Sequence, residues 1–188
     1  MPTVRTEAEK AKPDKKSSET PRNRKLKKRK PTGPKNARLM IDARGAAKGL
    51  TREAIGALKK MGYWDDLTKN IYAIRISSRG GALSVREDGR LADSLWTYYR
   101  DDKTGELGDL CDLLFFTQAI EDDVARQAVY YAQGRLDHPA PTLPEFWAVL
   151  LAHEVAHCST RGQRGEAYST RWETKVLAGF GIDRVGSP

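Results

Sequence analysis

Hydrophobic and polar residues follow two different patterns along the chain. Apolar residues are sparse before Leu39, whereas from Leu39 onward they recur with the spacing of helices and strands. A segment with so few apolar side chains cannot bury a core. We therefore expect a disordered arm over residues 1–38 and a single folded domain over residues 39–188.

The first half of this domain predicts one helix and one hairpin. The helix is expected to begin at Thr51, a residue type favoured at the N-cap, and to end at Gly62, which can adopt a left-handed conformation. Residues 71–76 and 82–86 have the composition of strands, and the Ser- and Gly-rich residues 77–81 between them predict a turn.

Two further segments are strand candidates. Residues 113–117 (LLFFT) are continuously apolar and predict a buried strand. Residues 124–132 (VARQAVYYA) fit the periods of both a strand and a helix imperfectly, and we favour a strand.

The strongest helical pattern follows residue Thr142. Thr142 and Glu145 have the spacing of a capping box, and no Pro or Gly interrupts residues 145–159. This helix is apolar on nearly all sides, so it is expected to be central. A polar turn then leads into a second helix over residues 166–181, which we expect to run antiparallel to the first. The fold class expected from these elements is α+β, with a small mixed or antiparallel sheet packed on the central helix.

Charge changes the interpretation of the arm. The 188-residue chain has a net charge of +8, but residues 1–38 hold 14 basic and 4 acidic side chains (14 − 4 = +10), which leaves −2 for the remainder. A basic segment attracts polyanions by counterion release, so nucleic acid is the expected partner of residues 10–38. The alternative is a tail that only aids solubility.

Several classes of protein are excluded by composition. No apolar run is long enough to span a bilayer, so we expect no membrane partner and a protein that is cytoplasmic or nucleoid-associated, or nuclear in a eukaryotic host. Cys111 and Cys158 lack paired metal-ligand spacing and are expected to be buried thiols. A monomer is expected.

The chemistry predicted for the domain centres on His153, Glu154 and His157, which form an HExxH sequence on the central helix. Histidines four residues apart lie on one helix face and can bind a single Zn²⁺. Glu154 points about 100° away around the helix, where a general base for a zinc-activated water would lie. A chain of this composition would contain the motif by chance with a frequency of about 0.003. The alternative is a pair of hydrogen-bonded core histidines, which would be costly to bury beside a carboxylate.

A catalytic zinc site usually has three protein ligands, so one more is needed. Glu166 and Glu173 both lie on the second helix, seven residues apart and on nearly the same face. We favour Glu166 because it lies just across the turn from His157, and Glu173 remains the alternative.

With these residues the chain resembles the zincin metallopeptidases. A glutamate ligand on a following helix is similar to the gluzincins. The sequence from Arg164 to Tyr168 also resembles the His-Gly-x-x-aromatic element of SprT-like proteases, with Arg164 in place of the family's histidine. The resemblance covers residues 142–181. It implies a zincin-like fold in which an edge strand binds an extended substrate, and we expect residues 122–132 to be that edge. It also suggests that Tyr168 hydrogen-bonds the oxyanion.

The function expected from this resemblance is zinc-dependent hydrolysis of peptide bonds in a protein or peptide substrate, with the basic arm directing the enzyme to nucleic acid. One alternative is a nucleic-acid- or ribonucleoprotein-associated module whose metal site is structural or degenerate. Others are a secreted effector protease and an antirepressor-type metallopeptidase.

Overall fold

The computed structural model describes residues 37–80, 89–102, 105–136, 138–161 and 163–182. Residues 1–36 of the expected arm lie outside this part of the chain; Ala37 and Arg38 are described, and Arg38 already belongs to the first strand. The strand expected over residues 82–86 also lies outside it.

The described residues form an α+β fold with one four-stranded mixed sheet and five helices. In chain order the elements are β1 (Arg38–Ile41), α1 (Gly45–Lys60), α2 (Trp64–Thr68), β2 (Ala73–Arg79), β3 (Ala92–Arg100), β4 (Leu107–Phe116), α3 (Thr117–Ala132), α4 (Leu143–Ser159) and α5 (Gly165–Gly179). The expected fold class is thus confirmed at this level.

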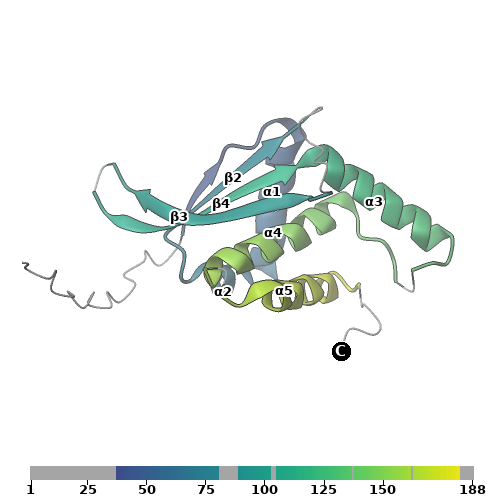
Figure 1. Ribbon diagram of the computed structural model, residues 1–188. Coiled ribbons are helices and arrows are strands. Elements are labelled where there is room, and N and C mark those ends of the chain that lie inside the picture. The colour runs from purple at the N-terminus through teal and green to yellow at the C-terminus, as the bar shows by residue number, and fades with distance from the viewer. Residues whose placement is uncertain (1–36, 81–88, 103–104, 137, 162, 183–188) are drawn as a thin grey trace, which may run out of the picture. The chain divides into compact units, whose positions relative to one another are not determined.

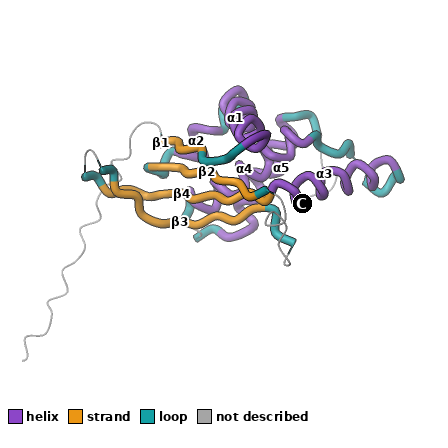
Figure 2. Tube along the Cα trace, turned by 90° about the horizontal axis from the view of Figure 1, so that it is seen from above, coloured by secondary structure: helices purple, strands orange, loops and turns teal. Residues whose placement is uncertain are grey.

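The sheet has the strand order β1-β2-β4-β3 (Figure 2). Strands β1, β2 and β4 are parallel, while β3 pairs with β4 in the antiparallel sense, with Trp96 opposite Cys111. Strand β3 is therefore an edge strand, and among the described residues it has a strand neighbour on one side only.

The turn predicted at residues 77–81, between the expected strands 71–76 and 82–86, is wrong at residues 77–79, which belong to strand β2. Strand β2 continues through Arg79, and its two neighbours are β1 and β4, both parallel to it. Parallel neighbours require crossover connections rather than tight turns, and α1 with α2 supplies the crossover between β1 and β2. The strand predicted at residues 113–117 is confirmed but is the end of a longer strand, β4.

The N-cap predicted at Thr51 is also wrong. Helix α1 begins six residues earlier, at Gly45, so Thr51 lies inside it. Thr51 is fully buried, and its hydroxyl donates a hydrogen bond to the carbonyl oxygen of Ala47 at 2.7 Å, which satisfies it without a capping role. Gly62 does follow the helix end with a left-handed φ of 74°.

Helix α4 is the centre of the fold (Figure 1). It packs against β3 and β4 on one side and against α5 on another, and α1, α2 and α3 also contact it. The ring of Trp147 stacks on Phe115 of β4 with 5.0 Å between centroids, and both side chains are fully buried. The prediction of a central, apolar helix over residues 145–159 is therefore confirmed.

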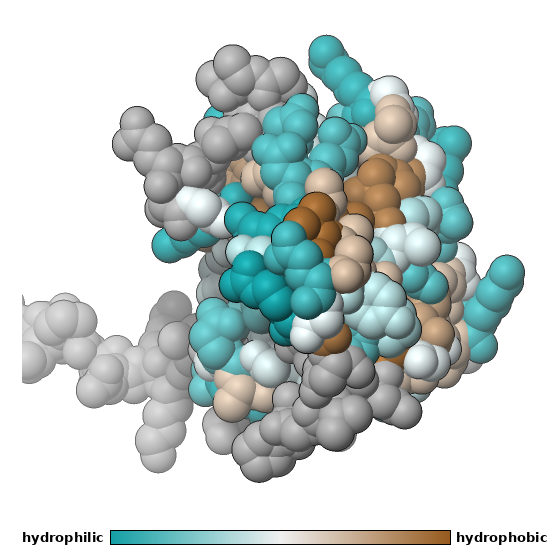
Figure 3. All heavy atoms as spheres, turned by 90° about the vertical axis from the view of Figure 1, so that its right-hand side faces the viewer, coloured by the Kyte–Doolittle hydropathy of each residue, from teal (hydrophilic) through white to brown (hydrophobic). Residues whose placement is uncertain are grey.

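Residues 124–132, for which we favoured a strand, belong to helix α3. This helix buries only Ile120, and Val129 and Tyr131 are about half exposed. Figure 3 views the side of the molecule on which α3 lies and shows apolar surface interspersed with polar surface. A helix with so little buried surface has a weak hydrophobic period, which explains the wrong prediction.

The cysteines differ from expectation as well. Cys111 of β4 and Cys158 of α4 form a disulfide, with 5.4 Å between their Cα atoms, rather than two buried thiols. Both side chains point into the interface between the sheet and α4, which brings them together although they are 47 residues apart.

No helix among the described residues is long and apolar enough to cross a membrane.

Candidate metal centre

The backbone at the start of α4 explains why the two histidines are presented on a regular helix. The carboxylate of Glu145 accepts hydrogen bonds from the backbone N–H of Thr142 at 2.7 Å and from its hydroxyl at 2.8 Å. This capping box, with a proline in the first turn, fixes the first turn of the helix. The helix then continues without interruption to Ser159, so His153 and His157 lie one turn apart on the same face.

Three side chains from two helices converge at this face. The Nε2 atoms of His153 and His157 lie 3.0 Å apart. Carboxylate oxygens of Glu166, at the start of α5, lie 3.4 Å from Nε2 of His153 and 3.5 Å from Nε2 of His157. The structure therefore brings together the three residues favoured as metal ligands.

The spacing of these atoms fits a metal ion. Ligands at about 2.0–2.1 Å from a tetrahedral zinc are separated from one another by about 3.3 Å. The observed separations are close to this value, and two imidazoles with one carboxylate are a donor set that zinc accepts readily.

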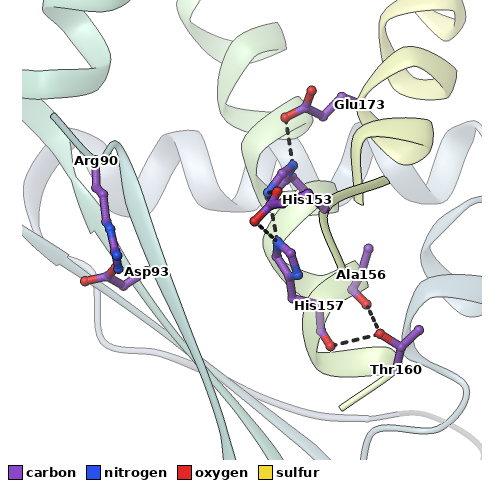
Figure 4. Close-up of polar contacts among 8 residues, drawn as sticks. Arg90, Asp93, His153, Ala156, His157, Thr160 and Glu173 are labelled. Carbon is purple, nitrogen blue, oxygen red and sulfur yellow. Dashed lines mark hydrogen bonds and ion pairs between the residues drawn. The ribbon is translucent and has the colours of Figure 1, made fainter. Parts of the chain in front are cut away.

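Glu173 lies on the opposite side of His153. Its Oε1 atom is 2.7 Å from Nδ1, while Nε2 faces His157, as Figure 4 shows. The two atoms are within hydrogen-bonding distance, but the angle at Nδ1 is too bent for a hydrogen bond. Glu173 is thus placed to orient the His153 ring, whereas Glu166 is placed with the nitrogens that would hold a metal.

Carboxylates dominate the electrostatics of His153. Burial lowers its pKa, but the close carboxylate of Glu173, with smaller contributions from Glu154 and Glu166, outweighs this effect and raises the pKa above its usual value. The negative charge that favours an imidazolium would equally favour a bound cation.

Glu154 lies in the same cavity. Its side chain is buried, with 8% of the residue exposed, and it lines a cavity of about 580 Å³ together with both histidines and both α5 glutamates. The opposite wall is formed by the start of β3, including Asp93, Ser94 and Trp96. The strand next to the site is therefore β3 and not residues 122–132, which lie in α3.

Tyr168 is placed elsewhere. It lines a second cavity of about 400 Å³, and the guanidinium of Arg164 lies 5.1 Å from its ring. It follows Glu166 by two residues, which rotates it by about 200° around α5 and away from the α4 histidines. The structure does not bring it into the cavity that holds Glu154.

Two residues at the end of this cavity were not identified from sequence. Arg161 follows His157 by four residues, a spacing that continues the row of histidines past the end of α4, and this signal was available. Trp96 lies beneath it, with 5.1 Å between the guanidinium and the ring. The strand that carries Trp96 was not predicted at all.

Comparison of the chain with models of known protein families, with curated proteins and with solved structures finds no match to any of them.

Proposed function

We propose that the chain is a zinc-dependent endopeptidase of zincin type, of the compact gluzincin or SprT-like kind. The observation that carries the proposal is the convergence of His153, His157 and Glu166 in one cavity with the buried carboxylate of Glu154. The imidazoles are half-buried and lie among several carboxylates, an arrangement that a bound cation or a proton stabilises.

His153, His157 and Glu166 would hold the zinc ion. When bound, the ion would polarise the scissile carbonyl and lower the pKa of a bound water toward about 7. The described residues offer three ligands here rather than four, which is typical of catalytic zinc and favours this reading over a structural site.

Glu154 would transfer a proton from the attacking water to the leaving group. Its carboxylate would accept a proton from the attacking water and donate it to the nitrogen of the leaving amine. Its place on α4 next to His153 keeps it in the cavity without making it a ligand, and only 8% of the residue is exposed.

Strand β3 would align the substrate. It is the edge of the sheet nearest the histidines, and residues 92–94 and Trp96 of this strand line the cavity. An extended peptide could add to this edge by main-chain hydrogen bonds, which would present its backbone carbonyl groups to the site.

The test combines metal analysis with proteolysis of the full chain. Purified protein should contain one zinc per chain, His153→Ala and Glu166→Ala should lose it, and Glu154→Gln should keep it but no longer cleave an unfolded protein substrate. Glu121→Gln, which changes an exposed carboxylate on α3, is the matched control. Cleavage by the Glu154→Gln protein, or zinc bound equally by all variants, would reject the proposal.

We also propose that the basic arm directs the enzyme to nucleic acid. The observation that favours it is the +10 balance of residues 1–38 against −2 in the remainder. Replacing the basic residues of the segment 22–30 by glutamine in the full chain should weaken binding to DNA and RNA and reduce its dependence on salt, while peptide cleavage is retained. Equal binding by both proteins would show that the arm has another role.

A further inference from the structure

We propose that Arg161 selects substrates that carry a carboxylate group near the scissile bond. This inference rests on the proposed peptidase function and concerns which peptides the same cavity accepts. The carboxylate can belong to an acidic side chain or to a peptide C-terminus, since a guanidinium recognises both in the same way.

The position of Arg161 supports this role. Arg161 follows His157 by four residues but lies just beyond the end of α4, so the cavity rather than helical spacing places its guanidinium near the two imidazoles. It lines the cavity that contains both histidines and Glu154, and its side chain is 52% exposed, so a ligand can reach it.

The guanidinium is held in a fixed orientation. Its Nε and Nη2 atoms donate hydrogen bonds to Oδ2 of Asp109 at 3.1 and 2.7 Å, and the Trp96 ring lies 5.1 Å away. Asp109 lies on β4 and Trp96 on β3, so two strands hold one side chain of the loop after α4. Among the described residues Nη1 makes no hydrogen bond, which leaves N–H groups for a ligand.

The backbone conformation of Arg161 also supports a role in ligand binding. Its φ is 53°, and among the described residues it is the single residue other than glycine with a positive φ. This conformation is unfavourable for an L side chain and is compensated here by the contacts of the side chain and by a hydrogen bond from its N–H to the carbonyl of Cys158. Such residues concentrate at binding sites.

The charge distribution in the cavity restricts where a substrate carboxylate can lie. Glu154, Glu166 and Glu173 surround the histidines and would repel a further anion. At the other end of the cavity, Arg90 is paired with Asp93 at 3.0 Å. Arg161 is paired as well, with Asp109, so pairing alone does not distinguish the two ends; we place the acidic group at the Arg161 end because Asp109 and the Trp96 ring together orient this exposed guanidinium.

The test compares matched peptides with the full-length zinc protein. In one set, glutamate is compared with glutamine at each position around the scissile bond. In the other, a free C-terminus is compared with an amide. We expect at least one acidic peptide to be cleaved about tenfold more efficiently, in kcat/KM, than its neutral partner, as for a partly exposed charge-assisted contact. Which set shows the preference identifies the source of the carboxylate.

Arg161→Gln should reduce this ratio to about one, and Arg161→Lys should retain part of it, because lysine keeps the charge but loses the planar fork. Arg126→Gln, which removes the same charge from α3, should keep the full ratio. The same preference should appear in peptide dissociation constants measured with the Glu154→Gln protein, a readout that does not depend on cleavage.

The two proposals fail differently. Cleavage with no acidic preference in either set, or a preference unchanged in Arg161→Gln, would overturn the role of Arg161 and leave the peptidase intact. Absence of cleavage of every peptide would overturn the peptidase, and the role of Arg161 in that reaction with it.

Discussion

At the scale of single residues, the two glutamates of α5 differ because each reaches a different nitrogen of His153. Glu166 lies beside Nε2 and Glu173 beside Nδ1. A carboxylate on the far nitrogen of a metal-binding imidazole fixes the ring and makes it more basic, and it is not itself a ligand.

We therefore predict different losses for two variants. Glu173→Gln should weaken zinc binding about 10- to 100-fold while the stoichiometry stays at one, because the ring loses its orienting charge. Glu166→Gln should reduce the affinity for zinc further, since it removes a ligand. Competition against a chromophoric chelator measures both, and equal losses in the two variants would contradict the assignment.

The pKa of His153 predicts how zinc binding depends on pH. Because this pKa is raised in the folded protein, protonation of His153 stabilises the metal-free fold at low pH, and that contribution is lost as the pH rises through the folded pKa. Zinc must displace the same proton.

The increase in Tm caused by zinc should therefore grow as the pH is raised from about 5.5 to about 8. Thermal unfolding of chelator-treated protein with and without zinc measures it, and His153→Gln should show a smaller dependence on pH. A zinc effect that is larger in acid would argue against His153 as a ligand.

Sequence alone predicted that His153, Glu154 and His157 lie together, because all three belong to one short helical motif in which spacing determines geometry. It could not decide between Glu166 and Glu173. They lie on nearly the same face of α5, and the outcome depends on which nitrogen of His153 each reaches, a matter of how two helices pack.

At the scale of elements, α4 is stabilised at its start by the capping box and along its length by burial. We predict that Glu145→Ala destabilises the fold by about 1 kcal/mol, since the N–H and hydroxyl of Thr142 both lose their acceptor. Chemical denaturation measures the change. Glu121→Ala, on the exposed face of α3, should change the unfolding free energy by much less, and an equal effect would mean that the cap contributes little.

How well an element was predicted depends on how clearly its burial is reflected in its sequence. Helix α4 was predicted well because its cap and its apolar residues indicate the same structure. Strand β3 was missed because its burial is partial along most of its length, with Leu95 and Tyr98 about 60% exposed, so its residues lack a clear alternation. Contacts such as that between Arg161 and Asp109, 52 residues apart, have no local signal.

At the scale of the whole molecule, the Cys111–Cys158 disulfide links β4 to the last turn of α4. Closing a loop of 47 residues restricts the unfolded chain, which corresponds to about 4 kcal/mol in the chain-entropy model. We predict that a reductant, or Cys111→Ala with Cys158→Ala, lowers the unfolding free energy by about 2–4 kcal/mol.

Denaturant titrations with and without reductant measure this loss, and thiol titration of the unfolded, unreduced protein provides the control. Two free thiols in that sample would show that the bridge does not form.

The order of the elements along the chain has a consequence for synthesis. In the part of the chain that the structure describes, the four strands of the sheet precede α4, and every residue of the proposed zinc site lies between His153 and Glu173. A growing chain on the ribosome can thus pair its sheet, including the edge that would receive a substrate, before any imidazole of the site has been translated. If the proposed function holds, hydrolytic activity would arise only after the sheet has been synthesised, so a nascent chain could not attack neighbouring polypeptides before α4 and α5 are made.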